Sequence, residues 1–262
     1  MTKKRVIRVV LWVGVALSLG TWAIGQTPVT LTGAGNNVYD GVYVSPYYAT
    51  VNGVANTTVI CDDFADNSYL NTPAWGASTT KFSSLSSTSI PTAWGAKDGA
   101  FQSTLSLYDD VAWLSLQLLQ QPTGTSGVLG TQDEYSFAIW AVFDPSGVLS
   151  WLQTAGPNGT PDTALCLAIF GNSCTSDKAT GGLLANLPTS FSPGEFANVL
   201  IISPDKPGTN TVCAAGNCPE QEFIEVVPEG GAPFVYLLLA GLCCFGAIRM
   251  RARRQIGSTT AA

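Results

Sequence analysis

Cys61, Asp62 and Asp63 follow one another near the end of a predicted strand, and Asp66 comes three residues later. A thiol can act as a nucleophile, and carboxylates can bind Ca²⁺ or transfer protons. These acids lack the alternating spacing of a calcium loop, and neighbouring strand residues point to opposite faces, so Asp62 and Asp63 would not converge. We expect a solvated strand end, with Ca²⁺ binding and an exported hydrolase using Asp62 or Asp63 as alternatives.

Other catalytic groups are missing from the sequence. The chain has no His, which excludes His-based triads, His proton shuttles and His metal sites. We find no Gly-rich phosphate loop, no dinucleotide-binding fingerprint and no nucleophile elbow. The sequence therefore predicts a protein that is not an enzyme and that holds no cofactor or metal.

Five of the seven cysteines lie outside the apolar segment near the C-terminus. Two pairs are close enough in sequence to form local disulfides in an oxidising compartment, although the connectivity stays open. The pairs are Cys166 with Cys174 and Cys213 with Cys218. Cys61 is then left over, as a buried inert thiol, a free or modified thiol, or one half of an intermolecular bridge.

The elements that position these residues begin with strands. We expect strands over 38–46, Tyr47–Val51 and 57–64, the last two forming a hairpin around an Asn-Gly turn. Residues 71–99 are rich in Ser, Thr and Gly and predict a loop with a short strand. Strands over 196–203 and 222–227 would close the sheet.

Helical periodicity appears in the middle of the chain. Over 105–121, Leu107, Val111, Leu114 and Leu118 share one face, with Asp109 and Asp110 expected in the first turns. A second helix is predicted over 132–143, after a Thr131 N-cap with Glu134 three residues on. Shorter helices are expected at 148–154 and 162–170.

These patterns predict an α+β fold with a β-sheet or sandwich-like core, two or three inserted helices and one C-terminal transmembrane helix. Four scattered tryptophans could form a platform for sugar rings, but their spacing favours core packing. They are Trp75, Trp94, Trp113 and Trp151.

The N-terminus has the form of a signal peptide over residues 1–25. A basic start precedes an apolar run of 12 residues over 9–20, and Ala23-Ile24-Gly25 suits signal peptidase. An uncleaved membrane helix is the alternative. Export through the Sec translocon would release a globular domain over 26–225.

Charge supports this topology. Eight of the 12 Lys and Arg lie in the two terminal segments, and all 18 Asp and Glu lie from Asp40 to Glu229. With four Lys against 18 acids, the exported part carries a net charge of −14. Basic flanks stay on the cytoplasmic side of the membrane, and so acidic a body excludes nucleic acid as a partner.

The C-terminus, over 226–254, resembles a PEP-CTERM sorting signal. Val227, Pro228, Glu229 and Gly230 stand at the motif, although Gly230 occupies a place where Pro is usual. An apolar segment over 232–248 follows, then a basic stop over 249–254 and a cytoplasmic tail over 255–262. The stop contains Arg249, Arg251, Arg253 and Arg254. The resemblance implies processing by exosortase, a membrane protease of Gram-negative bacteria that make exopolysaccharide; a plain membrane anchor is the alternative.

The exported domain also resembles bacterial thioester adhesin domains, on Cys61 and Ala138-Ile139-Trp140. There a strand Cys bonds to a helix Gln and can couple to amines. Ser136 stands in the place of that Gln, and Gln132 lies four residues earlier on the same helical face.

Together these features predict an exported cell-surface or extracellular-matrix protein, structural or adhesive in a biofilm and in contact with extracellular polysaccharide. A covalent thioester adhesin using Cys61 and Gln132 is the first alternative, and an exported hydrolase is the second.

Overall fold

The computed structural model describes residues 26–34, 38–39, 41–64, 70–71, 74–86, 89, 92–93, 104–123, 130–154, 160–171, 174, 181–205 and 221–227. Several predictions lie outside these residues: the signal peptide, most of the sorting motif (228–230), the apolar segment 232–248, the basic stop and the tail. Asp66, Trp94, Cys213 and Cys218 also lie outside them.

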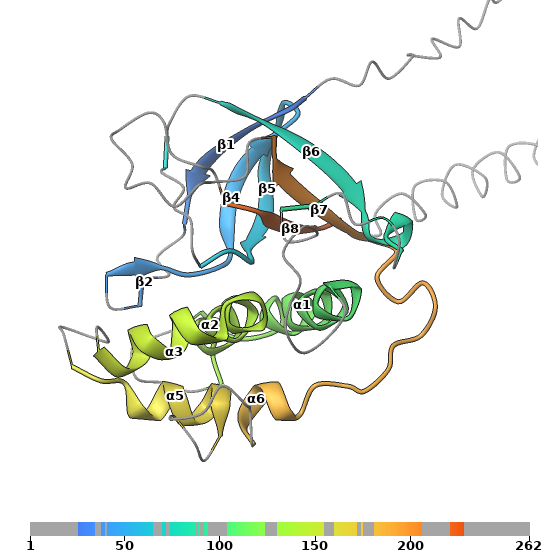
Figure 1. The fold of residues 1–262 in the computed structure, drawn as a ribbon. Helices are drawn as coiled ribbons and strands as arrows, with labels where there is room; N and C mark the ends of the chain where they lie inside the picture. The colour runs from blue at the N-terminus through green and yellow to red at the C-terminus, as the bar shows by residue number, and fades with distance from the viewer. Residues whose placement is uncertain are drawn as a thin grey trace, which may run out of the picture.

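Six strands form a closed antiparallel barrel (Figure 1), in the order β1-β4-β5-β8-β7-β6. Their bounds are β1 Thr27–Gly33, β4 Tyr47–Val51, β5 Val54–Cys61, β6 Trp75–Lys81, β7 Val199–Pro204 and β8 Phe223–Val226. The α+β class is confirmed. The sandwich-like core is wrong, because β1 pairs with both β4 and β6 and so joins the two edges of the sheet.

The predicted hairpin is confirmed between β4 and β5. Asn52 has φ 49° and Gly53 has φ 80°, and the flanking Val51 and Val54 are paired. Two successive residues with positive φ define the tight turn whose twist matches that of the strands, and Asn-Gly suits it.

Two strand predictions are corrected. The segment 38–46 is not one strand: β2 (Val38–Tyr39) and β3 (Val42–Tyr43) form a separate small sheet. Within the polar stretch 71–99, β6 is a full barrel strand of seven residues that pairs with β1 and β7. Only Ala77 and Thr80 of β6 are buried, and its outward Ser and Thr side chains concealed the strand pattern.

The helices lie together on one side of the barrel, in two layers (Figure 1). Helix α2 (Gln132–Phe143) contacts β5 and α1 (Thr104–Leu118) contacts β8, while α3 (Pro145–Thr154) packs on α2. The second layer holds α5 (Thr163–Phe170) and α6 (Gly182–Ala185), and a short 3-10 helix, η1 (Phe82–Ser84), follows β6. The described residues thus contain more helices than the two or three expected.

The helix starts differ in detail from the predictions. Because α1 begins at Thr104, no acid lies in its first turn, and Asp109 and Asp110 follow in the second. Thr131 is the N-cap residue of α2 as predicted, but its side chain does not cap the helix. Glu134 instead accepts a 2.5 Å hydrogen bond from the N–H of Gly130.

One continuous core joins the barrel interior to the helices, with Trp140, Tyr108 and Phe137 among its largest buried side chains. Trp75, Trp113 and Trp151 pack against this core rather than forming an exposed platform. Among the described residues, no helix has the length and apolar character needed to span a membrane.

Candidate functional site

The ends of two barrel strands bring a group of acids into the core. Cys61 of β5 pairs with Phe223 of β8, and the N–H of Asp62 donates a 3.3 Å hydrogen bond to the carbonyl of Glu222. Asp62 and Glu222 are fully buried, and Asp63 is 2% exposed. The expected solvated strand end is therefore wrong: α1 and α2 cover these strand ends. We call Asp62, Asp63 and Glu222 the buried acid cluster.

Three donors hold the Glu222 carboxyl group. The hydroxyl of Tyr108 donates to Oε1, while the Ser203 hydroxyl and the Ala93 N–H donate to Oε2, the last over 2.7 Å. Burial raises the pKa of Glu222, and these hydrogen bonds oppose that shift. Glu222 thus ties α1, β7 and the loop before α1 to the start of β8.

The carboxyl group of Asp62 lies near that of Glu222, but no described residue donates a hydrogen bond to it. Neither carboxyl oxygen of Asp62 accepts a hydrogen bond from the described residues. Burial and then the charge of Glu222 raise the pKa of Asp62 well above its usual range. Burial and the facing carboxyl group both favour the proton-bound form of Asp62 over the charged one. Lys81, the one basic residue in the described ranges, is exposed and supplies no counter-charge.

Hydrogen bonds of both its backbone and its thiol fix Cys61 next to the buried acid cluster. Its N–H donates to Ser45 Oγ over 3.0 Å, its carbonyl accepts from Trp140 Nε1 over 3.0 Å, and its Sγ–H donates to the Asp63 carbonyl over 3.1 Å. The thiol is free and fully buried. Burial and then the nearby acids raise the pKa of Cys61 well above that of an ordinary thiol.

The two residues of the alternative thioester, Cys61 and Gln132, belong to β5 and α2, which contact each other. Gln132 begins α2 and is 9% exposed, and its carbonyl accepts a 2.8 Å hydrogen bond from Ser136 Oγ. Ser136, which stands where the resemblance places Gln, also lies 3.4 Å from the carbonyl of Ser45, the residue that bonds Cys61.

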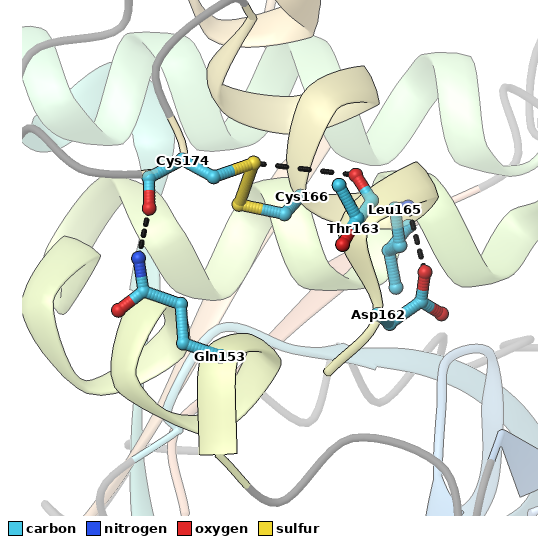
Figure 2. Close-up of a disulfide and its surroundings, with 6 residues drawn as sticks. All are labelled: Gln153, Asp162, Thr163, Leu165, Cys166 and Cys174. Atoms are coloured by element: carbon cyan, nitrogen blue, oxygen red, sulfur yellow. Dashed lines mark hydrogen bonds between the residues drawn. A yellow bond between two sulfur atoms is a disulfide. The ribbon is translucent and has the colours of Figure 1, made fainter. Parts of the chain in front are cut away.

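Figure 2 shows the disulfide between Cys166 of α5 and Cys174, with a Cα–Cα distance of 5.7 Å; it is one of the two local pairs expected from the sequence. Gln153 of α3 donates to the Cys174 carbonyl. Asp162 caps α5, because its carboxylate accepts a 2.9 Å hydrogen bond from the N–H of Leu165. The same carboxylate also accepts a hydrogen bond from the Tyr39 hydroxyl. The disulfide therefore fastens the outer helical layer and has no redox partner among the described cysteines.

A groove of about 670 Å³ lies elsewhere, between η1, the first half of α1 and the segment 184–197 that leads to β7. Asp109, Asp110 and Glu195 line it, together with the aromatic rings of Phe82, Phe191 and Phe196. None of Cys61, Asp62, Asp63 and Glu222 lines this groove. We call it the acidic groove.

Sequence reasoning missed both Glu222 and the acidic groove. Glu222 is a single acid before a short strand, and nothing local indicates that Tyr108 and Ser203 meet it. The groove has a weak signal in Pro188, Phe191 and Pro193, which suggest an ordered loop, but its acids come from two distant segments.

The described residues contain no group of three or more Cys, Asp or Glu side chains arranged to hold a metal ion. No family model, curated protein or solved structure matches the chain. The site must therefore be interpreted from its own chemistry.

Proposed function

We propose that the protein is an exported cell-surface or extracellular-matrix protein of a Gram-negative bacterium, structural or adhesive and not an enzyme. Its setting is an exopolysaccharide or biofilm matrix. Its C-terminal segment is a sorting signal, recognised by an exosortase-type protease after export through the Sec translocon.

The position of the sorting motif carries this proposal. β8 ends at Val226, and the N–H of Val227, the first motif residue, donates a 2.8 Å hydrogen bond to the carbonyl of Asn198. The motif thus begins directly after the last barrel strand. Cleavage beyond Val227 would remove no strand of the barrel, as a processed surface domain requires.

The intact mass of the protein purified from its native host tests the proposal. We expect a C-terminus between Val227 and Gly231, and added mass there would identify the group to which the protein was joined. A chain that still ends at Ala262 in cells with active exosortase would reject processing and leave a plain membrane anchor.

The covalent adhesin remains a second proposal, favoured by one observation. The Trp140–Cys61 hydrogen bond sets α2 against the end of β5, as coupling between Cys61 and a glutamine of α2 would require. The same mass spectrum tests it, because a thioester with Gln132 would release one ammonia. An undiminished mass would leave Cys61 a structural thiol.

A further inference from the structure

The acidic groove holds a carboxyl group that lacks a partner. Asp110 is 7% exposed and lines the groove, yet it accepts no hydrogen bond from the part of the chain described. The carboxyl oxygens of Asp110 are not among the fully enclosed unpaired atoms of the described residues, so they open onto the groove, where a donor can reach them. A ligand that donates hydrogen bonds would supply what the fold leaves out.

The charge of the groove sets the charge of that ligand. Burial and then Asp109 raise the pKa of Asp110 to about 6, and burial and then Glu195 raise the pKa of Asp109. Lys81 does not line the groove. Asp109 therefore lies close enough to Asp110 and to Glu195 to repel both, and no basic residue of the described ranges lines the groove to offset this repulsion. A cationic group would relieve the repulsion, and a further anion would increase it.

The three acids are spread along the groove, and this spacing indicates a ligand larger than a single ion. They form no cluster that could hold one metal ion within the described ranges, so a compact bare cation does not fit them. The groove volume of about 670 Å³ falls within the range of about 300–1,000 Å³ that is usual for organic ligands.

The remaining lining supplies apolar surface and hydroxyl groups. Phe196 packs against Phe82 and Phe191 with ring centroids 5.1 Å apart in both pairs, and Phe191 is partly exposed. The hydroxyl side chains include Ser83, Ser106, Thr189, Ser190 and Ser192. Rings with apolar faces and many hydroxyl groups suit such a surface.

The wall that carries Glu195 is preformed. Residues 192–195 make a turn in which the Glu195 N–H donates 3.0 Å to the Ser192 carbonyl, with Pro193 second and Gly194 third at φ 80°. This is the sequence that a type II turn requires. The Ser192 N–H donates back to Glu195 Oε2 over 2.8 Å, which fixes the carboxylate in place.

We infer that the acidic groove binds an oligosaccharide that carries amino groups, with Asp109, Asp110 and Glu195 facing its ammonium groups and the Phe191 ring against a sugar face. The inference rests on the proposed function, because it names the polysaccharide chemistry that an adhesive surface protein would meet. Fully N-acetylated and anionic glycans lack the cation and would bind poorly.

The test titrates the full chain by calorimetry with a tetramer of β-1,4-linked glucosamine and, separately, with its N-acetylated counterpart. We expect the amino tetramer to bind about ten- to one-hundredfold more tightly, and Asp110→Asn to weaken it by a similar factor, the value of a hydrogen bond to a charged group. Asp205→Asn, a single charge loss at an exposed site outside the groove, should leave binding unchanged. Equal binding of the two tetramers, or none, would overturn the inference.

A second variant guards against misfolding. Glu195→Gln removes charge from an exposed turn while its amide oxygen can still accept from Ser192, so the groove keeps its shape. It should also weaken the amino tetramer, and unchanged affinity in both groove variants would reject the site. Binding and processing are read separately, on protein purified from the native host. A processed protein that does not bind the amino tetramer rejects the groove alone, and a protein that binds but still ends at Ala262 in cells with active exosortase rejects the sorting proposal alone.

Discussion

The hydroxyl group of Tyr108, in the second turn of α1, donates a hydrogen bond to the carboxyl group of Glu222, which immediately precedes β8. Both side chains are fully buried, and 114 residues separate them in the chain. This contact joins the helical layer to the last strand of the barrel, so it links two parts of the fold that sequence proximity could not bring together.

Tyr108→Phe should destabilise the protein by about 1–3 kcal/mol, because it removes one donor from a buried carboxyl group while keeping the ring. Urea unfolding of the variant and the parent measures this difference. Tyr43→Phe is the matched control, since Tyr43 is 48% exposed and should change stability by less than about 0.5 kcal/mol. If both substitutions leave the free energy of unfolding unchanged, the Tyr108–Glu222 hydrogen bond does not stabilise the fold.

Stability should fall as the pH rises above about 4. Burial raises the pKa of Asp62 and Glu222 in the folded state, so this state binds more protons than the unfolded state between the two sets of values. Below the pKa values of the unfolded state, ionisation of these two carboxyl groups costs the folded state nothing. As the pH rises from those values to the higher pKa values of the folded state, the free energy of unfolding falls by at most about 1.4 kcal/mol per pH unit for each group.

Asp62→Asn tests the source of this pH dependence. The amide can donate to Glu222 without titrating, so the variant should lose stability less steeply with rising pH than the parent. Asp205→Asn controls for the removal of one carboxyl group at an exposed position. Parallel curves for Asp62→Asn and the parent in a series of urea titrations would show that Asp62 is not the titrating group.

Removal of the Cys166–Cys174 disulfide should lower the free energy of unfolding by about 2–3 kcal/mol, as expected for a loop this short. The disulfide links residues eight apart in sequence. Comparing the parent with Cys166→Ala plus Cys174→Ala, with and without reductant, separates this bridge from other cysteines. If reductant destabilises the double variant as much as the parent, the effect belongs to another pair.

The thiol of Cys61 should react with iodoacetamide at least about a hundredfold more slowly in the folded protein than in urea, since only the thiolate attacks. Burial and the acids at 62 and 63 both disfavour that thiolate. Mass spectrometry of the Cys61 peptide over time measures the rate. Rapid labelling of the native protein would contradict the buried position and favour a reactive role for this residue.

Patterns within short stretches of sequence correctly predicted the elements that form from residues close together in the chain. The face of Val111, Leu114 and Leu118 is buried as its spacing indicated, and the Asn52-Gly53 turn defines the β4–β5 hairpin. The disulfide between Cys166 and Cys174 followed from a short loop in sequence.

Contacts between distant segments could not be predicted in this way. Barrel closure depends on β6, whose Ser and Thr residues are typical of a loop in the sequence. The structure shows that β6 pairs with β7 and buries Ala77 and Thr80 in the core. The burial of Asp62 depends on helices that follow it by more than 40 residues, and the acidic groove joins Asp110 to Glu195. None of these pairings leaves a periodic or spacing signal in a single sequence.

The place of β8 in the barrel has a consequence for the timing of folding. This four-residue strand lies between β5 and β7, so until it is in place both of those strands keep an open edge. A chain made from its N-terminus therefore reaches Cys61 long before the partner of that residue exists. The barrel can close only after Val226 has left the ribosome and, in an exported chain, the translocon. Until that moment the domain exposes unpaired strand edges, and it needs protection from other copies of itself.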